Sequence, residues 1–193
     1  YFDFLRLYES GFENAVASLG TALTDDQVYL LNRFSQNTTL LYDGDPAGIK
    51  AAVRGGLACI SKGMQVKIVT LPEGEDPDSL ILQKGKEAMS EAIASAKDLI
   101  SFMATNEKID LGVKERIAQI LDALRPLQDP IQRELYLKQV SEAFGITVDA
   151  LYASLRRTSS GAQPQRDKVE ESVVESEIPE ERHALILALR DAD

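Results

Sequence analysis

The sequence contains one cysteine and one histidine among its 193 residues, and this scarcity excludes several kinds of site. Cys59 has no second cysteine to pair with, so we expect a reducing compartment and a buried, structural thiol. His183 is the sole imidazole and lies near the C-terminal end. A histidine-rich metal cluster is therefore excluded, and neither Ser18 nor Ser35 has a histidine to activate it as a nucleophile.

Long apolar runs and phosphate-binding loops are also missing. No stretch approaches the ~18 consecutive apolar residues of a membrane span, and the first residues lack the basic start and apolar run of a signal peptide. We therefore expect a cytoplasmic protein with no membrane partner. No glycine-rich loop is followed by Lys-Ser or Lys-Thr, which argues against a P-loop nucleotide triphosphatase.

Basic residues are too few for an ordinary nucleic-acid-binding protein. The net charge is −10, from 21 basic and 31 acidic residues. Residues 1–96 carry 8 basic and 13 acidic side chains, and residues 158–181 carry 2 and 7. Because phosphate contacts dominate affinity for nucleic acids, composition alone argues against DNA binding. It fits equally well an acidic site that metal ions complete.

The first part of the chain alternates between helical and extended patterns. Strands that are separated by helices predict right-handed crossovers and a parallel sheet, so we expect an α/β fold. Three strands make an incomplete sheet, which suggests that the N-terminal part of the domain is missing. The expected strands cover residues 15–18, 38–42 and 65–71, and the expected helices cover residues 2–10, 24–34 and 46–62.

After Leu71 the pattern becomes helical only. Apolar residues at helical spacing predict a small all-α subdomain, and a polar, acidic segment after it predicts a flexible linker. The apolar run from Ala184 to Leu189 predicts a last helix that begins another domain. The expected organisation is a sheet domain at 1–96, a helical subdomain at 97–157, a linker at 158–178 and a final segment at 179–193.

Two carboxylates directly follow the second expected strand. Asp43 and Asp45 are two positions apart, so both side chains can point to the same side, and the carboxyl ends of the strands are where open α/β sheets bind ligands. Neighbouring carboxylates repel each other unless a cation intervenes, and Mg²⁺ prefers one or two carboxylates plus water and phosphate. The alternative is an ordinary Asp-Gly turn in which Asp45 caps the next helix.

A second acidic loop follows the third expected strand. Residues 73–78 contain four acids, including Asp76 and Asp78, and no basic residue lies between Lys67 and Lys84. Loops after consecutive parallel strands meet at one edge of a sheet, which favours a shared cation site. The alternative is a solvated acidic loop in which Asp78 or Ser79 caps the next helix.

Two basic residues follow the first acidic loop. Lys50 and Arg54 share a helix face one turn apart and could approach substrate phosphates. A solvated helix face explains them equally well.

Three stretches together resemble the TOPRIM part of bacterial DnaG-type primases. They are Ala17-Ser18-Leu19-Gly20-Thr21-Ala22-Leu23-Thr24, then Tyr42-Asp43-Gly44-Asp45 with Ala47-Gly48, then Leu71-Pro72-Glu73-Gly74-Glu75-Asp76-Pro77-Asp78. Tyr1-Phe2-Asp3 also resembles the start of the helix that follows the family's catalytic glutamate, which would fall just before Tyr1. The likeness covers residues 1–157, and it implies a partial TOPRIM-type sheet followed by a helical subdomain.

The resemblance implies a mechanism and partners. Asp43 and Asp45 would bind Mg²⁺ or Mn²⁺ and act in catalysis, Asp76 and Asp78 would line the same metal site, and Lys50 would contact the substrate. The reaction would be two-metal-assisted nucleotidyl transfer on single-stranded DNA, in the bacterial replisome. The 3′-hydroxyl of the RNA primer would attack the α-phosphate of a ribonucleoside triphosphate, and pyrophosphate would leave. Zinc would belong to a missing upstream module, and the C-terminal end would dock on the replicative helicase.

Other functions remain open at this point. Type IA topoisomerases and some nucleases use similar acidic loops, although such topoisomerases have a third acid where Ala47 stands. A receiver or phosphatase domain would need a Thr or Ser and a Lys after later strands, where an acid cluster stands instead. The isolated fragment, inactive without the glutamate, could also be a non-catalytic docking module.

Overall fold

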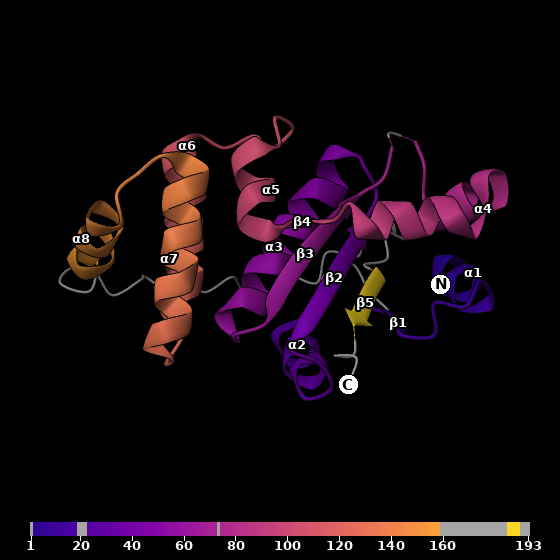
Figure 1. Cartoon of the computed structure of the whole chain (residues 1–193), viewed down its shortest axis with the longest axis horizontal. Coiled ribbons are helices and arrows are strands. Elements are labelled where there is room, and N and C mark those ends of the chain that lie inside the picture. Colours follow the sequence, from indigo (N-terminus) through magenta and orange to yellow (C-terminus); the bar gives the residue numbers. More distant parts are fainter. Residues whose placement is uncertain (1, 19–22, 73, 159–184, 190–193) are drawn as a thin grey trace, which may run out of the picture.

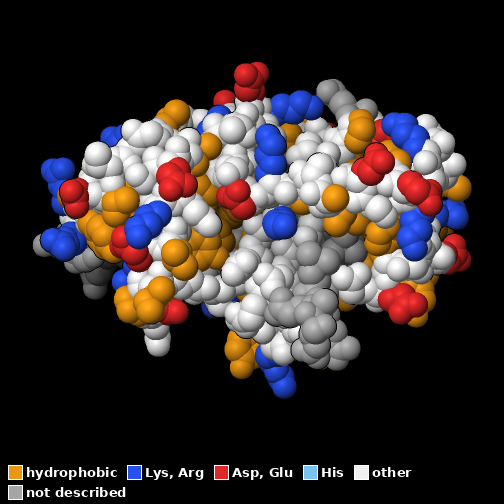
Figure 2. Space-filling model, viewed as in Figure 1, with side chains coloured by type: hydrophobic (Ala, Val, Ile, Leu, Met, Phe, Trp, Pro, Cys, Tyr) orange, Lys and Arg blue, Asp and Glu red, His pale blue; other side chains and the backbone are white. Residues whose placement is uncertain are grey.

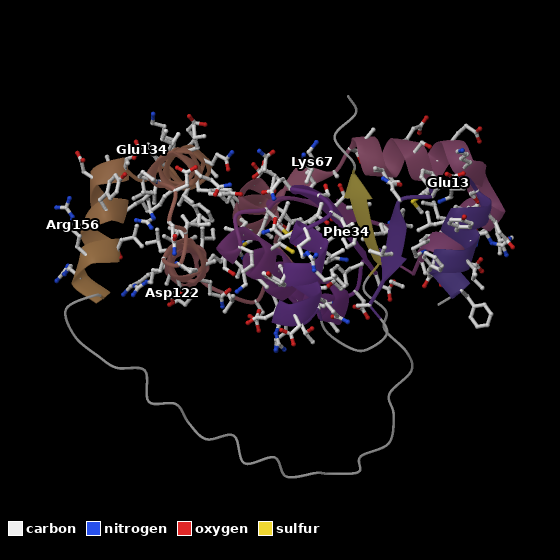
Figure 3. All side chains as sticks on the ribbon, turned by 90° about the horizontal axis from the view of Figure 1, so that it is seen from below. Glu13, Phe34, Lys67, Asp122, Glu134 and Arg156 are labelled. Atoms are coloured by element: carbon white, nitrogen blue, oxygen red, sulfur yellow. The ribbon has the colours of Figure 1, made fainter. Side chains whose placement is uncertain are left out.

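A computed structural model describes residues 2–18, 23–72, 74–158 and 185–189, the last of these as backbone only. The molecule is elongated, with a sheet in the middle (Figure 1). Helices α1 (Phe2–Glu9) and α4 (Pro77–Ala94) lie at one end, and α6 (Val113–Leu124), α7 (Pro130–Phe144) and α8 (Val148–Thr158) lie at the other. Glu13, just after α1, and Arg156, on α8, mark these two ends in Figure 3.

The sheet has five strands in the order β1-β5-β2-β3-β4. Its bounds are β1 Ala15–Ala17, β2 Asn37–Tyr42, β3 Gln65–Thr70, β4 Lys97–Asp98 and β5 Leu185–Leu189. Strands β2 and β3 are parallel along their whole length. Strand β5 is antiparallel to both β1 and β2, so β1 runs in the same direction as β2. The three predicted strands are therefore present and point the same way.

Two of the strands correct the prediction from the sequence. The run that ends at Leu189 was expected to be a helix, but Leu185–Leu189 is a strand in the middle of the sheet order. A short, uniformly apolar run suits a central strand as well as a buried helix, and periodicity cannot separate the two. The expectation of helices only after Leu71 is also wrong, because Lys97–Asp98 pairs with the edge of β3.

Both faces of the sheet are buried, and successive β2 residues point to opposite faces. Leu40 and Tyr42 pack into the larger core, together with α3 (Pro46–Ser61) and α5 (Leu99–Thr105). Leu41 packs into the smaller core under α1 and α4. This two-sided burial explains why β2 has an apolar run in place of strict alternation.

The helical segment shares the larger core with the sheet. Leu137 of α7 and Leu151 of α8 belong to the same buried cluster as Leu40 of β2. The division at residue 96 remains a hypothesis about domains, and the expected linker lies outside the described residues. No helix of the described ranges combines the length and hydrophobicity needed to cross a membrane.

Local signals place helix α2 (Asp25–Asn32) and the end of α3 where the sequence predicted them. Helix α2 begins after Thr24, whose hydroxyl and backbone form a reciprocal capping pair with Gln27. Gly63, with φ of 82°, follows the end of α3, where a left-handed residue is needed. Cys59 is fully buried in α3, as expected.

Candidate active site

The two acidic loops lie against each other at the carboxyl ends of β2 and β3. Gly44 shows this most directly, because a β-carbon at this buried residue would lie 2.6 Å from the Leu71 carbonyl oxygen and 3.4 Å from that of Pro72. Only a glycine allows such a close approach of two backbones. The prediction that both loops meet at one edge of the sheet is confirmed.

The first acidic loop is a tight connection from β2 to α3. Asp45 is the N-cap of α3, and its Oδ1 accepts a hydrogen bond of 2.6 Å from the Gly48 backbone nitrogen. A β-carbon at Gly48 would lie 2.3 Å from the Asp43 carbonyl oxygen, so the first turn of α3 packs on the Asp43 backbone. Asp43 and Asp45 are both half-buried.

The capping role of Asp45 is compatible with metal binding. One carboxylate offers about four lone-pair positions, and the hydrogen bond from Gly48 uses one of them. Asp43 and Asp45 supply only hard oxygen donors, the type that Mg²⁺ and Mn²⁺ prefer. The residues present in this loop therefore fit a divalent ion bound by one or two carboxylates with water.

The second acidic loop is organised around the start of α4. The N-cap is exposed Asp76, and not Asp78 or Ser79 as expected from the sequence. Its Oδ1 accepts a hydrogen bond of 2.6 Å from the Ser79 backbone nitrogen. Glu75 accepts hydrogen bonds from the Ser79 hydroxyl at 2.7 Å and from Lys84 Nζ at 3.2 Å. These two hydrogen bonds, that from Ser79 most strongly, lower the pKa of Glu75. Lys84 thus gives this loop a cation of its own.

Asp78 has a cationic partner that the sequence did not reveal. Arg6 Nε of α1 donates a hydrogen bond of 2.6 Å to Asp78 Oδ1, and the hydrogen bond raises the pKa of Arg6. Both side chains are about one-third exposed, 34% and 32%. The contact fixes Asp78 to α1, so Arg6 would compete with a metal ion for the Asp78 carboxylate.

Asp3 is a site residue that the sequence reasoning missed. Its Oδ1 accepts a hydrogen bond of 3.2 Å from the Asp78 backbone nitrogen. Burial raises the pKa of Asp3, the hydrogen bond from Asp78 opposes that rise, and the negative charge of Asp76 adds to it. The available signal was its position two residues after Tyr1, inside one of the stretches that carry the family resemblance.

The predicted four-carboxylate site is therefore arranged as two neighbouring groups. Asp43 and Asp45 form one group. Asp76 and Asp78 form the other, and Asp3 belongs to this second group through its hydrogen bond with the Asp78 backbone. Within the described ranges, no three Asp, Glu, His or Cys side chains stand close enough together to hold a metal ion. How the predicted ligands divide a metal between them remains a hypothesis.

A lysine from the helical part of the chain reaches the first loop. Lys108 Nζ donates a hydrogen bond of 3.1 Å to the Gly44 carbonyl oxygen, across 64 positions in sequence. Lys50 and Arg54, the basic residues considered from the sequence, are exposed on α3.

One hollow of the described part of the chain lies away from the acidic loops. A cavity of about 430 Å³ is lined by the first residues of β2 and β3 and by α7. Those are the amino ends of the strands, opposite to Asp43 and Asp76. On the face seen in Figure 2, basic and acidic side chains are interspersed, without one continuous basic surface.

Comparison with known proteins agrees with this arrangement. Residues 1–81 match the family described as Toprim-like, and residues 108–149 match the DnaB-helicase binding domain of primase. The DNA primase of Clostridium acetobutylicum is 35% identical over 158 residues, which cover 79% of this chain and 26% of that protein. The Escherichia coli DNA primase is also 35% identical, with 78% of this chain and 27% of that protein covered.

Solved primase structures share the fold. The zinc-binding and RNA polymerase domains of Aquifex aeolicus primase superpose with a TM-score of 0.66 at 34% identity, over 79% of this chain and 38% of that one. A DNA primase domain from Pseudomonas aeruginosa gives a TM-score of 0.68 at 28% identity, over 81% and 52%. The chain spans about a quarter of the length of the curated relatives named above. It belongs to the family of bacterial DnaG-type DNA primases and corresponds to the Toprim-like region and the helical region that follows it.

Proposed function

We propose that this chain carries the metal-binding part of a primase active site, with Asp43 and Asp45 as the ligands of Mg²⁺ or Mn²⁺. The observation that supports the proposal is the contact of Gly44 with Leu71, because it brings the two acidic loops together where an α/β sheet binds ligands. The chemistry is nucleotidyl transfer, in which a ribonucleoside triphosphate extends an RNA primer on a single-stranded DNA template.

Asp43 and Asp45 have separate tasks in this proposal. Asp45 holds the start of α3 through Gly48 and fixes the loop geometry, while its remaining lone pairs and those of Asp43 bind the cation. A divalent ion held there neutralises charge on the triphosphate and positions its α-phosphate. Asp3, Asp76 and Asp78 extend the acidic surface next to that position, and Lys50 contacts substrate phosphates.

The same proposal implies two partners, a single-stranded DNA template and a replicative helicase. A structure of the DnaG primase catalytic domain bound to single-stranded DNA superposes with a TM-score of 0.65 at 29% identity, and we propose single-stranded DNA as the template here. Residues 108–149 would contact a DnaB-type replicative helicase. We place the activity in the bacterial cytoplasm, at the replisome.

The test is template-directed ribonucleotide incorporation with Mg²⁺ or Mn²⁺, in a polypeptide that carries this chain and has the length of the relatives. Asp43→Asn and Asp45→Asn are expected to lower synthesis by at least about a hundredfold, the scale on which lost electrostatic stabilisation reduces kcat. The paired change Asp25→Asn with Asp26→Asn, on exposed residues of α2, is the matched control. Synthesis that survives in both loop variants, with folding intact, would remove the metal assignment.

One observation favours a second role in addition to catalysis. The match of residues 108–149 to a helicase-binding family concerns a segment that packs on the sheet rather than a separate tail. Docking on a helicase would therefore bring the partner close to the acidic loops. A topoisomerase-type site is disfavoured, because Ala47 occupies the position of the third acid.

A further inference from the structure

One ammonium group is fixed at the first acidic loop. Lys108 Nζ lies 3.1 Å from the carbonyl oxygen of Gly44, the residue between Asp43 and Asp45. We infer that Lys108 is a positioning residue that holds this loop by its backbone and opposes binding of the divalent ion, so that it sets the metal affinity of the site. The inference rests on the proposed function and adds a residue that the acidic motif does not contain.

The backbone that carries Lys108 is held in place on both sides. The Lys108 nitrogen donates a hydrogen bond of 2.9 Å to Asn106 Oδ1, and the side chain of the next residue, Ile109, is buried in the larger core at 7% exposure. Lys108 therefore leaves the chain at a fixed point, and only its flexible stem and ammonium can move.

Arg116 of α6 fastens the same segment. Its guanidinium donates hydrogen bonds to the carbonyl oxygens of Met103, Asn106, Ile109 and Leu111, at 2.8, 3.1, 2.7 and 2.8 Å. A charged donor with four backbone acceptors makes a rigid connection between α5 and α6. The ammonium of Lys108 is consequently delivered to Gly44 by a preorganised segment.

The sign of the effect on metal binding follows from Coulomb's law. An ammonium and a divalent ion at neighbouring positions repel each other, so a metal bound by Asp43 and Asp45 must displace Lys108 or tolerate its charge. At ordinary ionic strength the repulsion is screened only in part over a few ångströms. Loss of this charge is expected to tighten metal binding about three- to tenfold.

Lys108 also shapes the loop through its hydrogen bond to Gly44, and this second effect would strengthen metal binding rather than weaken it. If the hydrogen bond to Gly44 mattered mainly because it shapes the loop, removing the lysine would loosen the ligands and weaken metal binding. The electrostatic effect dominates in our account because Gly44 also packs closely against the Leu71 backbone, which restricts the loop without Lys108.

The test is titration of this chain with Mn²⁺, followed by the electron paramagnetic resonance signal of the free ion. Lys108→Met and Lys108→Gln are both expected to lower the Kd for Mn²⁺ about three- to tenfold, and Lys108→Arg is expected to keep the wild-type Kd. Lys62→Met is the matched control, because Lys62 lies at the far end of the 16-residue helix α3, about 24 Å from the loop. Thermal unfolding of each variant checks that the fold is kept.

The possible outcomes separate this inference from the proposed function. In one outcome, Asp43→Asn abolishes Mn²⁺ binding but neither Lys108→Met nor Lys108→Gln lowers the Kd. That result overturns the inference about Lys108 and leaves the proposed metal site in place. Weaker binding in both uncharged variants overturns the inference as well, in favour of loop shaping. If the wild type binds no Mn²⁺, or if Asp43→Asn does not alter binding, the inference and the proposed metal site both fall.

Discussion

Arg6 and Asp78 are 72 positions apart in the sequence and form a hydrogen-bonded ion pair of 2.6 Å at the side of the candidate site. The pair ties α1 to the start of α4, next to the hydrogen bond that Asp3 accepts from the Asp78 backbone. Asp78 thus serves the packing of two helices as well as any role with a metal. The acidic surface of this protein is partly a structural feature, and its carboxylates differ in how available they are.

Arg6→Gln is expected to loosen α1 from α4, because it removes the cation that holds Asp78. Amide hydrogen exchange should become faster in α1 and in the first turn of α4, and Tm should fall modestly, since the pair is partly solvated. Arg33→Gln, at an exposed arginine after α2, is the control and should leave exchange in α1 unchanged. Equal exchange of α1 in the wild type and in Arg6→Gln would show that apolar packing alone holds this helix.

Gly44→Ala tests the contact between the two acidic loops. The added methyl group would lie 2.6 Å from the Leu71 carbonyl oxygen, so the loops must separate. We expect the free energy of unfolding to fall by about 1–3 kcal/mol, as for other overpacked positions, measured by urea denaturation. Gly112→Ala is the control, because its nearest neighbour is the flexible Glu115 carboxylate. Similar losses in both variants would argue against a tight loop contact.

Alkaline pH should destabilise the protein through buried groups on the larger core. Burial raises the pKa of Cys59 from 9.0 to about 12, and that of Tyr42 from 10.0 to about 12. Below pH 9 the Cys59 thiol keeps its proton in both the folded and the unfolded chain, so its full contribution to the free energy of unfolding is present. Above pH 9 the unfolded chain loses that proton first, and stability falls as pH rises, by up to about 1.4 kcal/mol per pH unit for each such group.

The measurement is the free energy of unfolding between pH 8 and 11, for the wild type and for Cys59→Ala. The variant should lose stability less steeply above pH 9, because one titrating group is gone, whereas Tyr42 still contributes in both proteins. Parallel pH profiles would mean that the Cys59 thiol is not buried as the structure describes.

Arg116→Lys should destabilise the connection between α5 and α6. Lysine keeps the charge but lacks the planar fork that reaches the four carbonyl oxygens, which would then lose part of their hydrogen bonding. We expect a loss of about 2–3 kcal/mol in urea denaturation. Arg125→Lys is the control, since Arg125 has a surface pair with Asp122 at 3.0 Å, and should cost less than about 1 kcal/mol. Equal effects of the two changes would contradict the anchoring role.

Local patterns in the sequence were sufficient for the elements around the site. The strand before Asp43, the helix after Pro46 and the cap at Asp45 follow from side-chain preferences within a few residues. The fold and the edge of the sheet that carries the acids were therefore predictable. The family resemblance rested on the same short stretches.

What the sequence could not predict are contacts between distant positions and short strands. Arg6 with Asp78 and Lys108 with Gly44 join residues more than 60 positions apart, and no local pattern encodes such pairs. Strand β4 has two residues, too few for any periodicity. Strand β5 lies between β1 and β2 because of pairing along the sheet, whereas its apolar run alone fits a helix equally well.

The most direct test of the central claim is the number of Mn²⁺ ions bound to this chain and to the double variant Asp43→Asn with Asp45→Asn, measured by electron paramagnetic resonance. The control is the pair Asp25→Asn with Asp26→Asn, which removes the same charge from α2. We predict that the loop variant loses a bound ion that the wild type and the control both retain. Equal binding by all three proteins would contradict the claim that Asp43 and Asp45 form the metal site.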